Sequence, residues 1–126
     1  MIFGAHFLLY STDPGADRGF FRDVLGLRSV ELGGGWPIFR LPPAEIGVHP
    51  SGGGRAQTHA GHALAATVLY LMCDDLAAEM ARLESAGVRC AEVQTAEWGS
   101  STSLRLPSGA EVGLYQPTHP TALALG

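Results

Sequence analysis

A repeated segment is the feature that most constrains this chain. Residues 39–48 run Phe-Arg-Leu-Pro-Pro-Ala-Glu-Ile-Gly-Val, and residues 104–114 run Leu-Arg-Leu-Pro-Ser-Gly-Ala-Glu-Val-Gly-Leu. The copies differ in length by one inserted glycine, Gly109. Each copy has the pattern of a strand, a proline-containing turn and a second strand. A repeat of this kind predicts two copies of one structural unit.

The elements that surround the two copies follow the same order. Residues 5–11 and 67–73 are apolar runs typical of buried strands, and each precedes a segment with one apolar helical face. The predicted helices run from Asp13 to Gly26 and from Asp74 to Gly87, the same separation in both halves (26 − 13 = 87 − 74). The remaining predicted strands cover 27–32, 36–41 and 45–49 in the first half, and 88–93, 102–106 and 111–115 in the second.

Each half is therefore predicted to be a βαβββ unit, and the fold class α+β. At 126 residues, the two units are expected in one domain. We expect module 1 at about 3–50, a linker loop at 51–63, module 2 at about 64–117 and a tail at 118–126. A sheet with a single helix leaves one face uncovered, so we expect two curved sheets that face each other across a cleft.

The composition limits the classes of partner. The net charge is −4 and the eight Lys and Arg residues do not cluster, so nucleic acid is not an expected partner. No apolar run is long enough to span a bilayer, and the N-terminus lacks the basic region of a signal peptide, so we expect a cytoplasmic protein with no membrane partner. Cys73 and Cys90 lack metal-site spacing and are expected to be reduced, buried thiols.

The sequence resembles the glyoxalase / bleomycin-resistance / extradiol-dioxygenase superfamily, also called the vicinal oxygen chelate proteins. The resemblance rests on the paired βαβββ units, the strand-to-helix transition at 69–76, the pair Trp98-Gly99 and the closing turn at 106–109 into 113–117. It covers about residues 3–117. It implies a small-molecule site in the cleft and, because such proteins often form dimers, a homodimer.

The resemblance also implies four positions for the ligands of a divalent metal. They fall on His6, Gly47, Thr67 and Gly113, and three of these lack a suitable donor atom. Residues two apart in a strand share a face, so a displaced set of His6, His49 and Glu111 is an alternative. A histidine on an apolar strand is equally compatible with a core position, so both interpretations of His6 stay open.

Two functional hypotheses follow from this pattern. The first is metal-independent binding of a small aromatic or apolar ligand, with no cofactor, in a cleft formed by Trp36, Phe39, His49, Trp98 and Tyr115. Ordinary sheet packing remains an open interpretation of each aromatic residue.

The second hypothesis is a metal-dependent lyase, isomerase or extradiol-type dioxygenase. It uses a divalent metal held by His6, His49 and Glu111 to polarise the substrate. His59 and His62, in the linker, are expected at the surface, and a role as loop ligands stays open.

Overall fold

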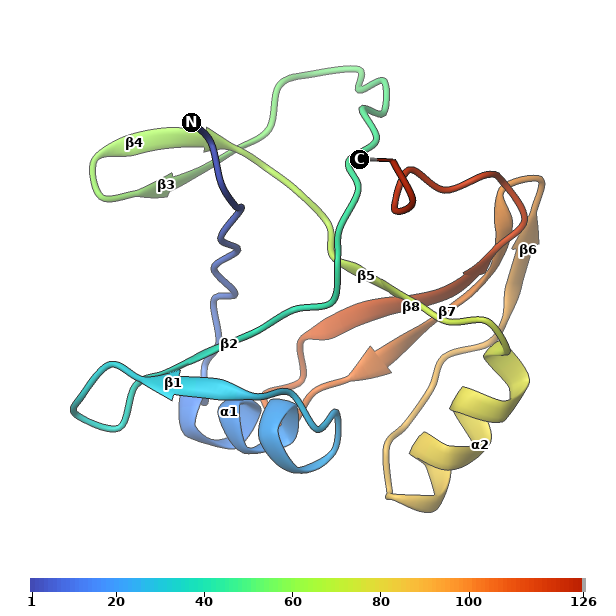
Figure 1. The fold of residues 1–126 in the computed structure, drawn as a ribbon, viewed down its shortest axis with the longest axis horizontal. Helices are drawn as coiled ribbons and strands as arrows, with labels where there is room; N and C mark the ends of the chain where they lie inside the picture. Colours follow the sequence, from blue (N-terminus) through green and yellow to red (C-terminus); the bar gives the residue numbers. More distant parts are fainter. Residues whose placement is uncertain (126) are drawn as a thin grey trace.

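The computed structural model describes residues 1–125 (Figure 1). Their fold is α+β, as the sequence predicts. The elements, in chain order, are α1 (Pro14–Asp23), β1 (Ser29–Glu31), β2 (Pro37–Phe39), β3 (Ala56–His59), β4 (His62–Ala65), β5 (Tyr70–Met72), α2 (Leu76–Ser85), β6 (Gln94–Ala96), β7 (Gly99–Arg105) and β8 (Glu111–Pro117). Gly126, the last residue of the expected tail, lies outside the described residues.

Both helices begin at an aspartate that caps the first turn. The Ala16 amide donates to Asp13 Oδ1 at 3.2 Å, and the Ala78 amide donates to Asp75 Oδ1 at 3.0 Å. These bonds satisfy amides that have no partner within the helix. The cap of α2 is therefore Asp75, one residue after the Asp74 at which the helix was predicted to begin. Gly26 and Gly87 follow the two helices with φ of +68° and +85°, a conformation that favours glycine.

Module 2 forms a four-stranded sheet in the order β5-β8-β7-β6 (Figure 1). The strand β5 is parallel to β8, and the other neighbours are antiparallel. The predicted strand at 88–93 contributes only an isolated bridge from Cys90 to Leu104, and β6 takes the edge position. One sheet face packs against α2, and Phe20 of α1 joins the same core. The buried apolar residues are Phe20, Leu76, Leu83, Val88, Leu104, Leu106, Val112 and Leu114.

Module 1 is less regular than predicted. It contains α1 and the antiparallel pair β1–β2, but residues 5–11 and 45–49 form no strand, so these two strand predictions were wrong. The last ladder bond runs from the Arg40 amide to the Arg28 carbonyl at 2.8 Å. Pro42 and Pro43 follow directly, and because proline has no amide hydrogen the ladder ends there.

A hairpin occupies part of the segment that the composition suggests is an unstructured loop. The strands β3 and β4 pair antiparallel from Ala56↔Ala65 to His59↔His62. Ala60 and Gly61 form the two-residue turn, with φ of 51° and 80°. Positive φ at both turn residues matches the right-handed twist of the flanking strands.

Specific hydrogen bonds join the two modules. The Ser108 amide, in the turn between β7 and β8, donates to Asp17 Oδ1 of α1 at 3.0 Å. The tail is held at two places: the Thr118 amide donates to the Trp98 carbonyl at 3.0 Å, and the Ala122 amide donates to Glu45 Oε1 at 2.8 Å. Within residues 1–125, neither helix has the length and apolar character needed to cross a membrane.

Candidate functional site

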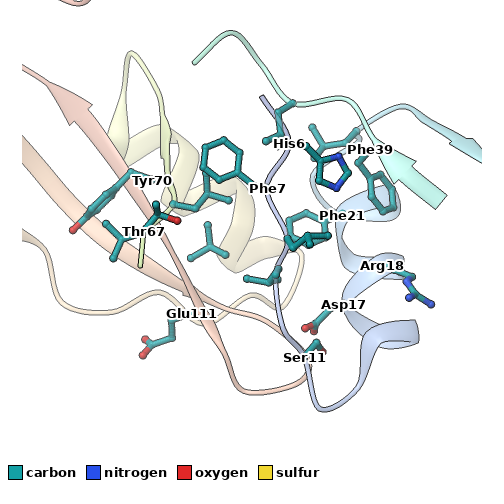
Figure 2. Close-up of a pocket in the computed structure, with 18 of the residues that line it drawn as sticks. His6, Phe7, Ser11, Asp17, Arg18, Phe21, Phe39, Thr67, Tyr70 and Glu111 are labelled. Atoms are coloured by element: carbon teal, nitrogen blue, oxygen red, sulfur yellow. The ribbon is translucent and has the colours of Figure 1, made fainter. Parts of the chain in front are cut away.

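A cavity of about 560 Å³ lies between the two modules (Figure 2). This volume is within the range of sites that hold drug-sized molecules. Module 1 contributes residues 5–9, α1 and β2, and module 2 contributes residues 67–70 together with the facing parts of β7 and β8. The walls are mostly apolar, and their aromatic members are Phe7, Phe21, Trp36, Phe39 and Tyr70.

Two carboxylates belong to the wall of this cavity. Glu111, at the start of β8, is exposed, and its Oε1 accepts a hydrogen bond from Ser103 Oγ at 2.7 Å. Asp17 is only 3% exposed and has a buried Oδ2 with no hydrogen-bond partner among residues 1–125. Figure 2 places Asp17 beside Ser11, with Glu111 nearer to the side of Thr67 and Tyr70.

The environment of Asp17 favours its charged form. Burial by itself would raise its pKa, but the polar groups of Ser108 and Ser11, among them the Ser108 amide that donates to Oδ1, outweigh burial and hold the pKa below its ordinary value. Asp17 also lies in the first turn of α1, where the helix dipole stabilises a negative charge. The cavity wall therefore contains an ionised carboxylate at neutral pH.

Tyr70 covers the position where the superfamily pattern places a late metal ligand. Tyr70 and Gly113 are directly paired in the parallel β5–β8 ladder. A Cβ atom added to Gly113 would lie 2.5 Å from Tyr70 Cε1 and 2.8 Å from Cγ, and closer still to Cδ1. The glycine is thus required by the ring, which packs directly over its backbone.

The Tyr70 ring also belongs to an aromatic cluster on the sheet. Its ring centroid lies 6.0 Å from that of Trp98 and 5.3 Å from that of Tyr115, in edge-to-face geometry. Trp98 and Tyr115 are 5.3 Å apart. Edge-to-face contacts of this kind stabilise the position of the ring by more than its buried area alone would. Tyr70 reaches both the cluster and the cavity, whereas Trp98 and Tyr115 lie outside the cavity wall.

His119 and Glu45 border this cluster, and sequence reasoning missed both. The His119 Nδ1 donates to the Pro120 carbonyl at 2.8 Å, which leaves Nε2 to accept the Tyr115 hydroxyl at 3.2 Å. Glu45 Oε2 lies 4.0 Å from the same Nε2. Burial, then the charge of Glu45, raise the pKa of Tyr115, so its hydroxyl remains a hydrogen-bond donor at neutral pH.

The candidate metal ligands do not come together. His6 and Glu111 both line the cavity, but Figure 2 shows His6 beside Phe39 and Glu111 on the opposite side. His49 is exposed, contacts the Pro50 carbonyl through Nδ1 at 2.7 Å and is not part of the wall. Among residues 1–125 there is no group of three or more His, Cys, Asp and Glu side chains suited to a metal ion.

The observed helix caps also change how the two modules align. His6 precedes the Asp13 cap by seven positions (13 − 6), and the residue seven before the Asp75 cap is Val68 (75 − 7) rather than Thr67. Valine has no ligand atom. Counted from the glycines that follow the helices, the corresponding residue is Thr67 (26 − 6 = 87 − 67). With either alignment, His6 is the one strong ligand of the four positions, which does not fit a divalent metal that needs three or four protein ligands.

The other candidate groups have structural explanations. Of the two linker histidines, His59 contacts the Tyr10 hydroxyl and His62 is its cross-strand partner, both on the exposed hairpin. Burial raises the pKa values of the Cys73 and Cys90 thiols, with a smaller contribution from nearby acidic residues. These thiols stay protonated at neutral pH, so they are poor nucleophiles.

Comparison with known proteins gives structural neighbours. Neither protein-family models nor curated proteins match this sequence. An antibiotic-binding protein from a Streptomyces species has 22% identity and a TM-score of 0.59, with 94% of this chain and 99% of that one covered. A lactoylglutathione lyase from Agrobacterium tumefaciens has 21% identity and a TM-score of 0.57, with 86% and 88% covered.

A third similar structure is a glyoxalase/bleomycin-resistance protein, also from a Streptomyces species. It has 20% identity and a TM-score of 0.53, with 84% of this chain and 93% of that one covered. At these identities the likeness concerns the fold, and a shared fold does not fix a reaction. The chain has the fold of the glyoxalase/bleomycin-resistance, or vicinal oxygen chelate, superfamily.

Proposed function

We propose that this protein binds a small, flat, apolar or aromatic molecule in the cavity between its modules, without a metal ion. The observation that carries the proposal is the Tyr70 ring over Gly113. An aromatic side chain occupies the space beside the backbone where a metal-binding carboxylate would project. The other aromatic walls, among them Trp36 and Phe39, offer surfaces on which a flat molecule stacks.

Two of the structural neighbours support a binding role. One is described as an antibiotic-binding protein and another as a glyoxalase/bleomycin-resistance protein. For the present chain, the ligand is expected to be held by packing and a few polar contacts rather than by coordination. No arrangement of donors among residues 1–125 favours the metal-dependent reaction over this binding role.

A pair of aromatic variants tests the binding site. Trp36 lines the cavity and is 52% exposed, whereas Phe3 is 95% exposed and lies outside the wall. Titration calorimetry with acridone, a neutral three-ring molecule, is expected to give a weaker affinity for Trp36→Ala by up to about tenfold, the value of one aromatic contact. Phe3→Ala is the control and should bind as the unmodified protein does. Equal losses in both variants would place the ligand elsewhere.

Metal content provides the second test. Protein purified without chelator is expected to contain far less than one equivalent of any divalent transition metal. The opposite result, a stoichiometric metal that disappears in His6→Ala, would show that a ligand set forms in solution and would refute the metal-independent proposal. A rise in the unfolding midpoint with acridone, but not with added Zn²⁺ or Mn²⁺, is the expected accompanying result.

We also propose that the protein forms a homodimer through module 1. Apolar side chains of that module are strongly exposed, including Val30 at 69%, Ile46 at 87% and Val48 at 93%. Strong exposure of several apolar side chains in one module favours association. Light scattering at micromolar concentration is expected to give twice the mass of the chain, and Val48→Glu is expected to weaken the association.

A further inference from the structure

We propose that the cavity selects organic cations, so that its ligand is a flat molecule with a protonated amine or amidine group. The inference rests on the proposed small-molecule binding and adds the charge of the ligand. It depends on three ionised side chains of the wall: Glu111, Asp17 and Arg18.

Glu111 supplies an exposed acceptor at the edge of the cavity (Figure 2). It lies two residues before Gly113 in β8, and therefore on the same face of the sheet as the glycine beneath the Tyr70 ring. The bond from Ser103 Oγ to Oε1 orients the carboxylate. Within residues 1–125, Oε2 has no hydrogen bond, and Arg105, its cross-strand neighbour, forms no ion pair with Glu111. One oxygen therefore remains available to a ligand.

Asp17 adds a second negative charge in the wall of the same cavity. One of its oxygens accepts the Ser108 amide, while the buried Oδ2 has no partner in the described part of the chain. A charge in such low-dielectric surroundings is screened less than a surface charge. Its field therefore extends into the cavity, even though the atom itself is covered.

Arg18 does not neutralise the Glu111 side of the cavity. Among residues 1–125 it is the only Lys or Arg side chain in the wall. Its guanidinium carbon lies 4.8 Å from the centre of the Trp36 ring, a cation–π contact. Figure 2 shows Arg18 directed away from Glu111 and Tyr70. The side of the cavity formed by Glu111 therefore stays electronegative, which attracts a cation and disfavours an anion.

Three probes of similar size and shape test this inference: proflavine as the cation, acridone as the neutral molecule and anthracenecarboxylate as the anion. Calorimetry at neutral pH is expected to rank proflavine above acridone and acridone above anthracenecarboxylate. Glu111→Gln keeps the shape and removes the charge, so it should weaken proflavine by about twofold to fivefold, the range for a partly exposed ion pair. Acridone binding should not change. Added salt should weaken proflavine only.

Glu84→Gln serves as the matched control, because Glu84 is an exposed carboxylate on α2, outside the cavity wall. Equal binding of the three probes, or the same loss of proflavine affinity in both variants, would overturn the charge preference and leave the proposed binding function standing. If none of the probes binds, acridone included, then the binding function fails and the charge preference fails with it.

Discussion

The contact between Gly113 and Tyr70 gives the sharpest prediction about this protein. A methyl group at position 113 would lie 2.5 Å from Tyr70 Cε1, far inside the distance at which two carbon atoms touch. The Tyr70 ring centroid lies 6.0 Å from that of Trp98 and 5.3 Å from that of Tyr115, so a displaced ring would lose these contacts. Gly113→Ala is therefore expected to destabilise the fold by about 1–3 kcal/mol, the usual cost of overpacking.

The same substitution, Gly113→Ala, made in a Tyr70→Ala variant separates the steric cost from its other effects. In Tyr70→Ala the ring is gone, and Gly113 has no left-handed φ that an alanine would resist. Gly113→Ala should then be neutral, or stabilising by about 0.4–1 kcal/mol because alanine restricts the unfolded chain. The two positions should show a coupling energy of about 1–3 kcal/mol.

The repeat supplies the control for this cycle. Gly47 occupies the corresponding position of module 1, and a Cβ there would have no atom within 4 Å. Gly47→Ala is therefore expected to change stability by less than about 0.5 kcal/mol. Urea unfolding of the four chains of the cycle and of Gly47→Ala measures all these values. An equal cost of Gly113→Ala with and without Tyr70, or an equal cost at positions 47 and 113, would refute the steric explanation.

Three further predictions concern single carboxylates. The pKa of Asp17 is lowered in the folded state, so the ionised carboxylate stabilises the fold above its unfolded pKa of about 3.9. This contribution disappears as the pH falls through the lower folded pKa. In urea unfolding, Asp17→Asn should therefore lose more stability at neutral pH than in acid below about pH 3. Asp75→Ala should cost about 0.5–2 kcal/mol because Asp75 caps α2, whereas Asp74→Ala, one residue earlier, should cost little. Glu45→Ala should speed hydrogen exchange of the Ala122 amide, because it removes the side-chain oxygen that accepts this amide. Glu97→Ala should not, because Glu97 accepts the Thr118 hydroxyl through its backbone carbonyl, which the substitution keeps.

Much of the fold follows from local sequence signals. The helices were predictable because each has an aspartate cap and a closing glycine, and these residues act on atoms within a few positions of themselves. The strand at 5–11 was predicted from its apolar character, and the strand at 45–49 from its place in the repeat. A strand also needs a partner with free backbone groups. Pro42 and Pro43 follow directly after the last backbone hydrogen bond of the β1–β2 pair, and they have no amide hydrogen with which to continue it. Neither apolar character nor the repeat predicts where such pairing stops.

The candidate site was less predictable because its defining contacts are long-range. Trp36 and Phe39 were expected at the cleft, and both line the cavity. Tyr70 was not singled out, although it pairs with Gly113 across the sheet. A ring that covers the backbone of a cross-strand glycine is a known way to stabilise a sheet, and the pairing would have indicated Tyr70 had the register been known. His119 carried no signal, because its role depends on a tail that folds back onto Tyr115.

The packing of Tyr70 bears on how this chain compares with metal-binding proteins of the same fold. If Gly113 had merely lost a carboxylate, then Gly113→Glu would restore one ligand. With the Tyr70 ring in place, any side chain at position 113 must first displace that ring from Trp98 and Tyr115. Gly47 has no donor either, and the position at Thr67 or Val68 offers at most a threonine hydroxyl. The glycine and the tyrosine therefore form one structural unit, and the wall of the cavity beside them is shaped by aromatic packing.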